Sequence, residues 1–324
     1  MSLPQRTQLL RWASQGRLDS RSLPAALKLV RATPTPAHWY RFLDRLALWT
    51  GLIFMASGVI FFFAYNWQAM GRYAKFGLAE LLLVVTVGAC WKLGLDKASG
   101  KASLLAATLL LGALLALVGQ TYQTGADTWE LFATWALLAL PWVLIGRFSG
   151  LLLFWIGLLN LSVVLYLQTF PGRFLWVGLI FGPEEHFRVL FLLNSTLLCL
   201  WELGARRIDW LQAHWSRRIL ATAGGVFATG LALFAIFEFN RGDLFNLLVY
   251  LAWVAAIFLY YRHKAFDLFV LAGTVLSLIV TITALLVRLL HSHAGSSLLI
   301  GLTVIGLATA GGLWLKKVAG EMPT

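Results

Sequence analysis

The run that decides the fold reads LALWTGLIFMASGVIFFFAYN at residues 46–66 and contains no charged side chain. An apolar run of about 20 residues can cross the roughly 30 Å hydrocarbon core of a bilayer as a helix. Nine similar runs follow it along the 324-residue chain. Hydrophobic residues make up 60% of the chain and charged residues only 12%, whereas soluble domains have about 25% charged residues. The composition therefore excludes a soluble globular protein and predicts a polytopic membrane protein.

All ten predicted spans are expected to be helices, because open strands cannot pair their backbone polar groups in lipid. The predicted fold class is thus all-α, a polytopic helical bundle of about ten transmembrane helices. The spans lie near residues 46–66, 73–95, 102–120, 129–146, 148–169, 187–204, 218–238, 245–261, 266–288 and 296–315. A further apolar run, at residues 174–181, is too short to span and is interpreted as interfacial or re-entrant.

The residues before the first span are expected to form a small cytoplasmic pair of amphipathic helices, near residues 5–15 and 20–31. Gly16 is predicted to end the first helix and Ser20 to cap the second. The sequence TPTP at residues 33–36 then breaks the helix and serves as a linker. The chain is accordingly divided into three parts: the helical pair and linker at 1–38, a first membrane bundle at 39–204 and a second at 205–324.

The 26 Lys and Arg residues fall unequally on the two sides of the predicted membrane. Counted over ten spans, 20 of them lie on the side of the N-terminus and 6 on the other. Because cytoplasmic loops carry the excess of basic residues, both termini are predicted to be cytoplasmic. The net charge of +12 is explained in this way. No nucleic-acid-binding module is recognisable, so the expected partners are the lipid bilayer and proteins, and not nucleic acid.

The segment most informative about function joins the third and fourth spans and reads GQTYQTGADTWE at residues 119–130. It has no Lys or Arg and, in this topology, lies at the outer face. Its amides, hydroxyl groups and carboxylates suit a polar or cationic ligand. With two residues of the first external turn, it forms a predicted binding rim of Asn66, Trp67, Gln120, Tyr122, Gln123, Asp127, Trp129 and Glu130. The simpler alternative is an ordinary turn in which Asp127 or Thr128 caps the fourth helix.

Glu80 is the acidic side chain most expected to be buried within a span, since it lies several residues inside the second one. A carboxylate at that depth is costly unless it pairs, faces water or binds a proton. One interpretation is an outward-opening proton or cation site, and the other is a structural ion pair with Arg72 or Lys75. Asn160 and Asn194 lie deeper in their spans, where interhelical hydrogen bonding is the usual role of an amide.

No complete catalytic or cofactor motif is present in the sequence, so an enzyme is not favoured and no cofactor or metal site is predicted. His186, His291 and His293, on external loops, are weak candidates for metal ligands, and histidines without a metal are the simpler interpretation. The sequence GLDKASGKA at residues 94–102 is similar to a phosphate-binding P-loop. Its glycines are one residue too far apart, however, and Ala102 replaces the required Ser or Thr, so we reject that interpretation.

Three features together resemble the bacterial membrane-protein family called domain of unknown function 2157. They are a helical pair with Trp12 and Gly16, then GLIFMASGVIFFFAYNW at residues 51–67, and GQTYQTGADTWELFATWALLALP at residues 119–141. The resemblance covers about residues 1–150. It implies an inner-membrane protein without an assigned activity, often encoded beside or fused to another multispan domain and a small membrane protein with a GDYxxLxY motif. That association implies a complex with another membrane protein.

The leading hypothesis is a noncatalytic multispan subunit of a bacterial inner-membrane complex that contacts its partner through the outer rim. Small residues four positions apart, such as Gly112 and Ala116, would allow close helix packing. The alternative is a transporter or a carrier of lipid or small molecules, with an outward-opening cavity near Glu80. A membrane enzyme would instead require outer carboxylates such as Asp127 and Glu130 to converge in one cleft.

Overall fold

The computed structural model describes residues 3–19, 21–30, 35–66, 68–123, 125–170, 185–237, 243–290 and 294–321. The structure is 87% helical, with twelve α-helices and, within these residues, no strand. Ten of the helices are long and apolar enough to cross a membrane. The predicted all-α polytopic fold is therefore confirmed.

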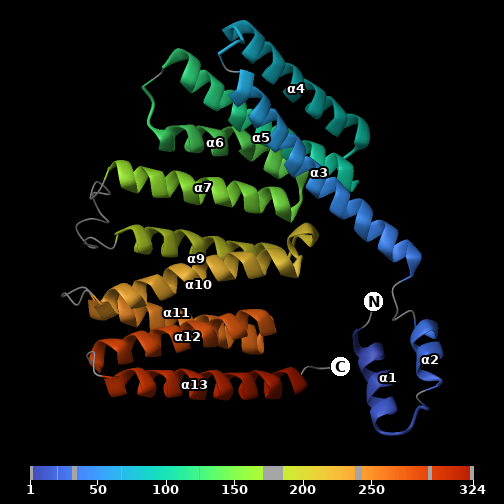
Figure 1. Cartoon of the computed structure of the whole chain (residues 1–324), viewed down its shortest axis with the longest axis vertical. Coiled ribbons are helices and arrows are strands. Elements are labelled where there is room, and N and C mark those ends of the chain that lie inside the picture. Colours follow the sequence, from blue (N-terminus) through green and yellow to red (C-terminus); the bar gives the residue numbers. More distant parts are fainter. Residues whose placement is uncertain are drawn as a thin grey trace. The chain divides into compact units, whose positions relative to one another are not determined.

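The helices follow one another along the chain, and Figure 1 labels them in order. They are α1 (Leu3–Ser14), α2 (Leu23–Leu29), α3 (Pro36–Asn66), α4 (Arg72–Leu93), α5 (Ala98–Tyr122), α6 (Thr128–Gly146), α7 (Ser149–Thr169), α9 (Glu185–Ala205), the 3-10 helix η1 (Asp209–Leu211), α10 (His214–Phe237), α11 (Asp243–His263), α12 (Leu268–Leu289) and α13 (Ala294–Gly320).

Each predicted span overlaps one of the helices α3–α7 and α9–α13. The largest difference is in α3, which begins at Pro36, ten residues before the predicted start of the first span at residue 46. Proline is well tolerated in the first turn of a helix, where its missing N–H costs no hydrogen bond. The last residue of the predicted linker therefore begins a helix. The predicted interfacial run at 174–181 lies outside the described residues.

The chain divides into two compact units. Unit 1 contains Met1–Leu110 and hence α1 to α4 with the start of α5, and unit 2 contains Leu111–Met322 with the rest of α5 and all later helices. The domain limits expected from the sequence, at residues 38 and 204, stay a prediction.

In unit 1 the short helices α1 and α2 pack against each other. Gly16 has a φ of 68°, in the left-handed region that glycine adopts at little cost, and the Arg17 backbone N–H donates to the Trp12 carbonyl at 2.9 Å. The prediction that Gly16 ends the first helix is confirmed. Ser20 lies outside the described residues, and Ser22 occupies the position before α2, without a capping hydrogen bond from its side chain.

The rejected P-loop sequence forms the tight turn between α4 and α5. Gly94 ends α4 with a φ of 77°, and the Lys97 backbone N–H donates to its carbonyl at 3.3 Å. Gly100, buried in the first turn of α5, lies so close to Gly94 that a Cβ on Gly100 would be 2.7 Å from the Gly94 carbonyl carbon and nearer still to the carbonyl oxygen. The two glycines are thus explained by close backbone approach at a helical turn.

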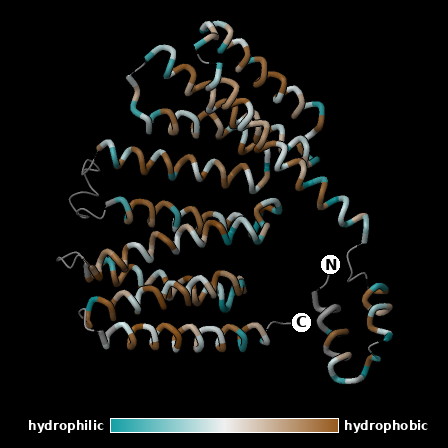
Figure 2. Tube along the Cα trace, in the orientation of Figure 1, coloured by the Kyte–Doolittle hydropathy of each residue, from teal (hydrophilic) through white to brown (hydrophobic). Residues whose placement is uncertain are grey.

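In unit 2 successive helices run in opposite directions across the view of Figure 1, and α10 is central because it packs against α7, α9, α11 and α12. Figure 2 shows apolar residues along the middle of these helices. Two buried clusters hold them together, one around Trp201, Leu220 and Leu271, and one around Tyr250 and Ala228. The helices α9 to α12 therefore form a well-packed core.

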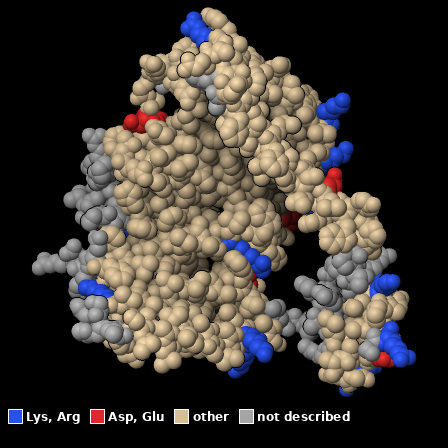
Figure 3. Space-filling model, in the orientation of Figure 1, with Lys and Arg blue, Asp and Glu red and all other residues tan. Residues whose placement is uncertain are grey.

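The charged side chains of unit 2 lie toward the ends of its helices. On the face drawn in Figure 3, the surface between those ends carries no charge. We call the end near the α9–α10 and α11–α12 connections the basic end, because nine cations lie there: Arg147, Arg206, Arg207, Arg217, Arg218, Arg262, Lys264, Lys316 and Lys317. The other end, which includes the α5–α6 connection, we call the rim end.

Candidate functional site

The α5–α6 connection places six of the predicted rim residues on one continuous stretch of unit 2. Gln120, Tyr122, Gln123 and Asp127 are all exposed, with Tyr122 at 59%. Gln123 has a φ of 44° and Gly125 a φ of 68°, so the chain reverses direction sharply between the helices. Asp127 precedes α6, but its carboxylate makes no capping hydrogen bond. The capping alternative is therefore not seen, and the carboxylate remains exposed.

Trp129 and Glu130 are half-buried in the first turn of α6, and Trp129 attaches this segment to the bundle. The Trp129 ring packs edge-on against Tyr166 of α7, with 5.0 Å between centroids, and Phe170 lies at 6.5 Å. Ser162 donates to the Trp129 carbonyl at 3.3 Å. The rim thus has an aromatic base on α7 below an exposed polar surface.

The other predicted site residues are not part of this segment. Asn66 ends α3 in unit 1 and donates to the Phe62 carbonyl at 2.9 Å, and Trp67 lies outside the described residues. His291 and His293 also lie outside them, and His186 is in the first turn of α9. Among the described residues, no group of three His, Cys, Asp or Glu side chains could hold a metal ion.

The Glu80 side chain is exposed on α4 of unit 1, so α4 and its neighbours do not bury it in protein, and its position within the membrane stays a prediction. Among the residues whose burial the structure describes, the buried acidic side chains are Glu202 of α9 and Asp267, which precedes α12, at 8% and 7% exposure. The two cavities that we describe below are lined by residues from Phe187 onward, and neither includes Glu80.

Two asparagines join α7 to α9 within the membrane-spanning part of unit 2. Asn194 Nδ2 donates to Asn160 Oδ1 at 2.6 Å, and Asn160 Nδ2 donates back to Asn194 Oδ1 at 3.3 Å. Each amide also donates to a carbonyl of its own helix, those of Leu190 and Ile156. The predicted interhelical hydrogen bonding is confirmed, and both amides are fully used in it.

Four hydroxyl groups link α10, α11 and α12 in the core of unit 2. Thr229 lies 2.7 Å from Ser277, Ser277 lies 2.9 Å from Tyr250, and Thr281 lies 3.0 Å from the Tyr250 hydroxyl. Thr229 also donates to the Gly225 carbonyl at 2.7 Å. Because each hydroxyl has a single proton, Ser277 must then donate to Thr229 and Tyr250 to Ser277. The chain of hydrogen bonds therefore has one direction, from Tyr250 through Ser277 and Thr229 to the Gly225 carbonyl. Thr281 shares its single proton between the Tyr250 hydroxyl and the Ser277 carbonyl.

This direction predicts unequal effects at two of its members. We expect Ser277→Ala to lower the free energy of unfolding by about 1–2 kcal/mol, because it leaves the buried Tyr250 hydroxyl without an acceptor. Tyr250→Phe should cost less, below about 1 kcal/mol, since Thr281 also donates to the Ser277 carbonyl at 2.9 Å. Unfolding by SDS titration in mixed micelles measures both. Equal costs, or a larger cost for Tyr250→Phe, would contradict the proton assignment.

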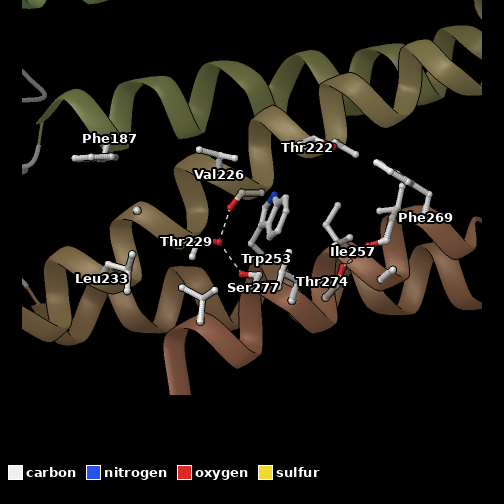
Figure 4. Close-up of a pocket in the computed structure, with 18 of the residues that line it drawn as sticks. Phe187, Thr222, Val226, Thr229, Leu233, Trp253, Ile257, Phe269, Thr274 and Ser277 are labelled. Carbon is white, nitrogen blue, oxygen red and sulfur yellow. Dashed lines mark hydrogen bonds between the residues drawn. The ribbon is translucent and has the colours of Figure 1, made fainter. Parts of the chain in front are cut away.

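An apolar groove runs between α10 and α12, with a volume of about 890 Å³. Figure 4 shows Trp253 and Ile257 at its base, with Thr229 and Ser277 bonded across it and Phe269 near one end. Val226 and Leu276 on its edges are exposed. The groove is therefore open and almost wholly apolar, with hydroxyl groups already paired to one another.

The Glu202 carboxylate near the basic end contacts side chains from two other helices. Tyr261 donates to Glu202 Oε1 at 2.7 Å and Tyr260 to Oε2 at 3.1 Å, while Arg217 Nη1 lies 3.6 Å from Oε2. Arg206 in turn hydrogen bonds to Tyr260, which raises the pKa of the Arg206 guanidinium above its usual range and keeps it charged. Glu202 therefore joins α9, α10 and α11 in one network.

A second cavity, of about 510 Å³, lies against this network. We call it the basic pocket, and it is lined by Glu202, Ala205, Arg206, Arg217, Tyr260, Lys264 and Ala265. Three of these side chains carry a positive charge and one a negative charge, so the pocket is cationic by two charges. A volume of this size is within the usual range for ligand sites.

The sequence interpretation missed the basic pocket and the hydroxyl chain. A signal for the pocket exists in the sequence, since Glu202 lies near the end of an apolar run, four residues before Arg206, and YYRHK follows at residues 260–264. The hydroxyl chain gives no such signal, because isolated Ser, Thr and Tyr residues occur throughout the spans.

Comparison with known proteins gives a family match that covers the α5–α6 connection. No curated protein and no solved structure matches the chain. Residues 10–170 match the family model described as "Predicted membrane protein (DUF2157)", a region that includes the end of α1, the helices α2 to α7 and the α5–α6 connection. The chain belongs, through these residues, to the DUF2157 family of predicted membrane proteins.

Proposed function

We propose that this protein is a noncatalytic multispan subunit of a bacterial inner-membrane complex, with both termini in the cytoplasm. Its partner, another membrane protein or a periplasmic one, would bind at the α5–α6 connection, residues 120–130. The observation that carries the proposal is a turn whose polar side chains are exposed while its base is fixed on α7 by Trp129.

The composition of this turn supports a protein contact. Tyr122 presents a large aromatic side chain beside two exposed amides, Gln120 and Gln123, and aromatic residues are enriched at protein interfaces. The fixed base reduces the entropy that binding would cost. The exposed polar groups of the turn, on a base that Trp129 fixes to α7, are therefore suited to a protein interface.

The charge of the turn indicates the chemistry of the partner. Asp127 and Glu130 give it two negative charges, and it contains no Lys or Arg. Like charges repel across an interface and opposite charges attract. We therefore expect the contacting surface of the partner to carry Lys or Arg side chains or hydrogen-bond donors.

The test is affinity purification of the tagged full-length protein in mild detergent, followed by mass spectrometry. We expect a stoichiometric membrane partner with the wild type and its loss from the variant Gln120→Ala, Tyr122→Ala, Gln123→Ala, Asp127→Ala. These side chains are exposed, so the variant should elute from size-exclusion chromatography as the wild type does. A matched control replaces Gln212 and His214, which are exposed at the basic end, and should retain the partner.

Two results would contradict the proposal. If the folded rim variant retains the partner as well as the control does, the contact lies elsewhere on the protein. If the wild type purifies alone with bound lipid or a small molecule, the alternative of a carrier takes precedence. The groove between α10 and α12, rather than Glu80, would then be the place to look for the bound molecule.

A further inference from the structure

The basic pocket has the features of an anion site at the end of a helical bundle. It lies between the C-terminal ends of α9 and α11 and the first turn of α10. Cations at the ends of membrane-spanning helices lie at the level of lipid headgroups, where basic pockets between helices bind phosphate-bearing groups.

Arg217 provides the strongest reason to expect a ligand. Its side chain is 17% exposed, and its Nε is buried and has no hydrogen-bond partner. A buried donor without a partner costs about 1–3 kcal/mol, so such groups are rare unless something else satisfies them. The Nε itself does not face the pocket, so an anion there would meet the other guanidinium nitrogens of Arg217 and neutralise its charge.

Glu202 does not make the pocket acidic, because its two oxygens are already used. Tyr261 occupies one of them, and Tyr260 and Arg217 occupy the other. The carboxylate thus holds Arg217 and Tyr260 in place. Arg206 and Lys264, which are exposed, remain to contact a ligand from the open side.

We propose that the basic pocket binds a phosphate group, carried either by an anionic lipid headgroup or by free phosphate. Arg206 and Arg217 supply guanidinium N–H donors, which suit phosphate oxygens because two can bind at once. Lys264 adds a third positive charge. The aromatic residue Trp215, exposed in the first turn of α10, is suited to contact the interfacial part of a lipid.

The proposal is independent of the rim, because the pocket is at the opposite end of the helices of unit 2 (Figure 1). The rim variant changes no residue that lines the pocket, and the pocket variant changes no residue of the rim. Failure of either proposal is therefore distinguishable from failure of the other.

The test measures binding of dioctanoyl phosphatidylglycerol to the delipidated full-length protein by native mass spectrometry, with inorganic phosphate as competitor. The pocket variant Arg206→Ala, Lys264→Ala should bind the lipid at least about tenfold more weakly than the wild type, because it lacks two charged contacts. The matched control Arg207→Ala, Lys316→Ala removes two exposed cations of the basic end that do not line the pocket. It should stay within about twofold of the wild type.

The competitor distinguishes the two sources of the phosphate. If inorganic phosphate binds by itself and displaces the lipid, the pocket is a site for free phosphate. If the lipid binds and millimolar phosphate does not displace it, the ligand is an anionic headgroup. Both results support the proposal.

Three results would overturn it. The first is equal weakening by the pocket variant and the control, which would mean diffuse charge attraction. The second is unchanged binding in the pocket variant. The third is a wild type that prefers neither phosphatidylglycerol over phosphatidylcholine nor phosphate over chloride. Should the double variant fail to fold, Lys264→Ala alone replaces it, with an expected loss of about threefold.

Discussion

Glu202→Ala is expected to lower the free energy of unfolding by about 3 kcal/mol, one of the largest effects of any single change in unit 2. The change leaves Arg217 buried without its anion and removes the acceptor of both Tyr260 and Tyr261. Loss of one partner from a buried ion pair is costly because the remaining charge is not solvated. Since α9, α10 and α11 all contribute to the network, the loss should affect the whole bundle.

SDS titration in mixed micelles, followed by circular dichroism, measures this cost. Glu321→Ala is the matched control, because Glu321 also pairs with an arginine, Arg262, but is 44% exposed. An exposed ion pair contributes less than about 1 kcal/mol. Glu202→Gln should fall between the two, since its amide keeps only one oxygen acceptor. A cost for Glu202→Ala no greater than that for Glu321→Ala would show that the network does not stabilise the bundle.

The membrane spans could be predicted from the sequence because one physical requirement decides them. A run of about 20 apolar residues must be helical in lipid, and each of the ten runs forms one helix that is long and apolar enough to span a membrane. The role of Gly16 was predictable because glycine adopts a positive φ at little cost, so it often ends a helix whatever the rest of the fold. The start of α3 at Pro36 was not, because proline both ends and begins helices.

The sites were harder to predict, because they depend on which helix faces meet. Depth along a span favoured Glu80 as the buried carboxylate, yet it is exposed, whereas Glu202 close to a span end is buried. What distinguishes them is the proximity of Arg217 and two tyrosines from other helices. The polar turn at residues 120–130, by contrast, is continuous in sequence, so its exposure could be expected from one segment alone.

Gly100→Ala is expected to open the turn between α4 and α5. The new Cβ would meet the backbone of Gly94, which cannot move aside as a flexible side chain can. Overpacking at such a site costs about 1–3 kcal/mol, and here it acts on a turn that Gly94 already holds at positive φ. We expect a loss of at least about 2 kcal/mol in unfolding free energy, together with faster proteolysis at residues 94–98.

Gly88→Ala in α4 is the control that separates this clash from the ordinary effect of the substitution. A Cβ at Gly88 meets no atom within 4 Å, and alanine favours a helix over glycine by about 0.5–1 kcal/mol, so this variant should be unchanged or more stable. If Gly100→Ala lowers the unfolding free energy and Gly88→Ala does not, the glycine at position 100 of GLDKASGKA is required for close backbone packing. If Gly100→Ala were neutral as well, the helical turn would no longer explain the resemblance of this sequence to a P-loop.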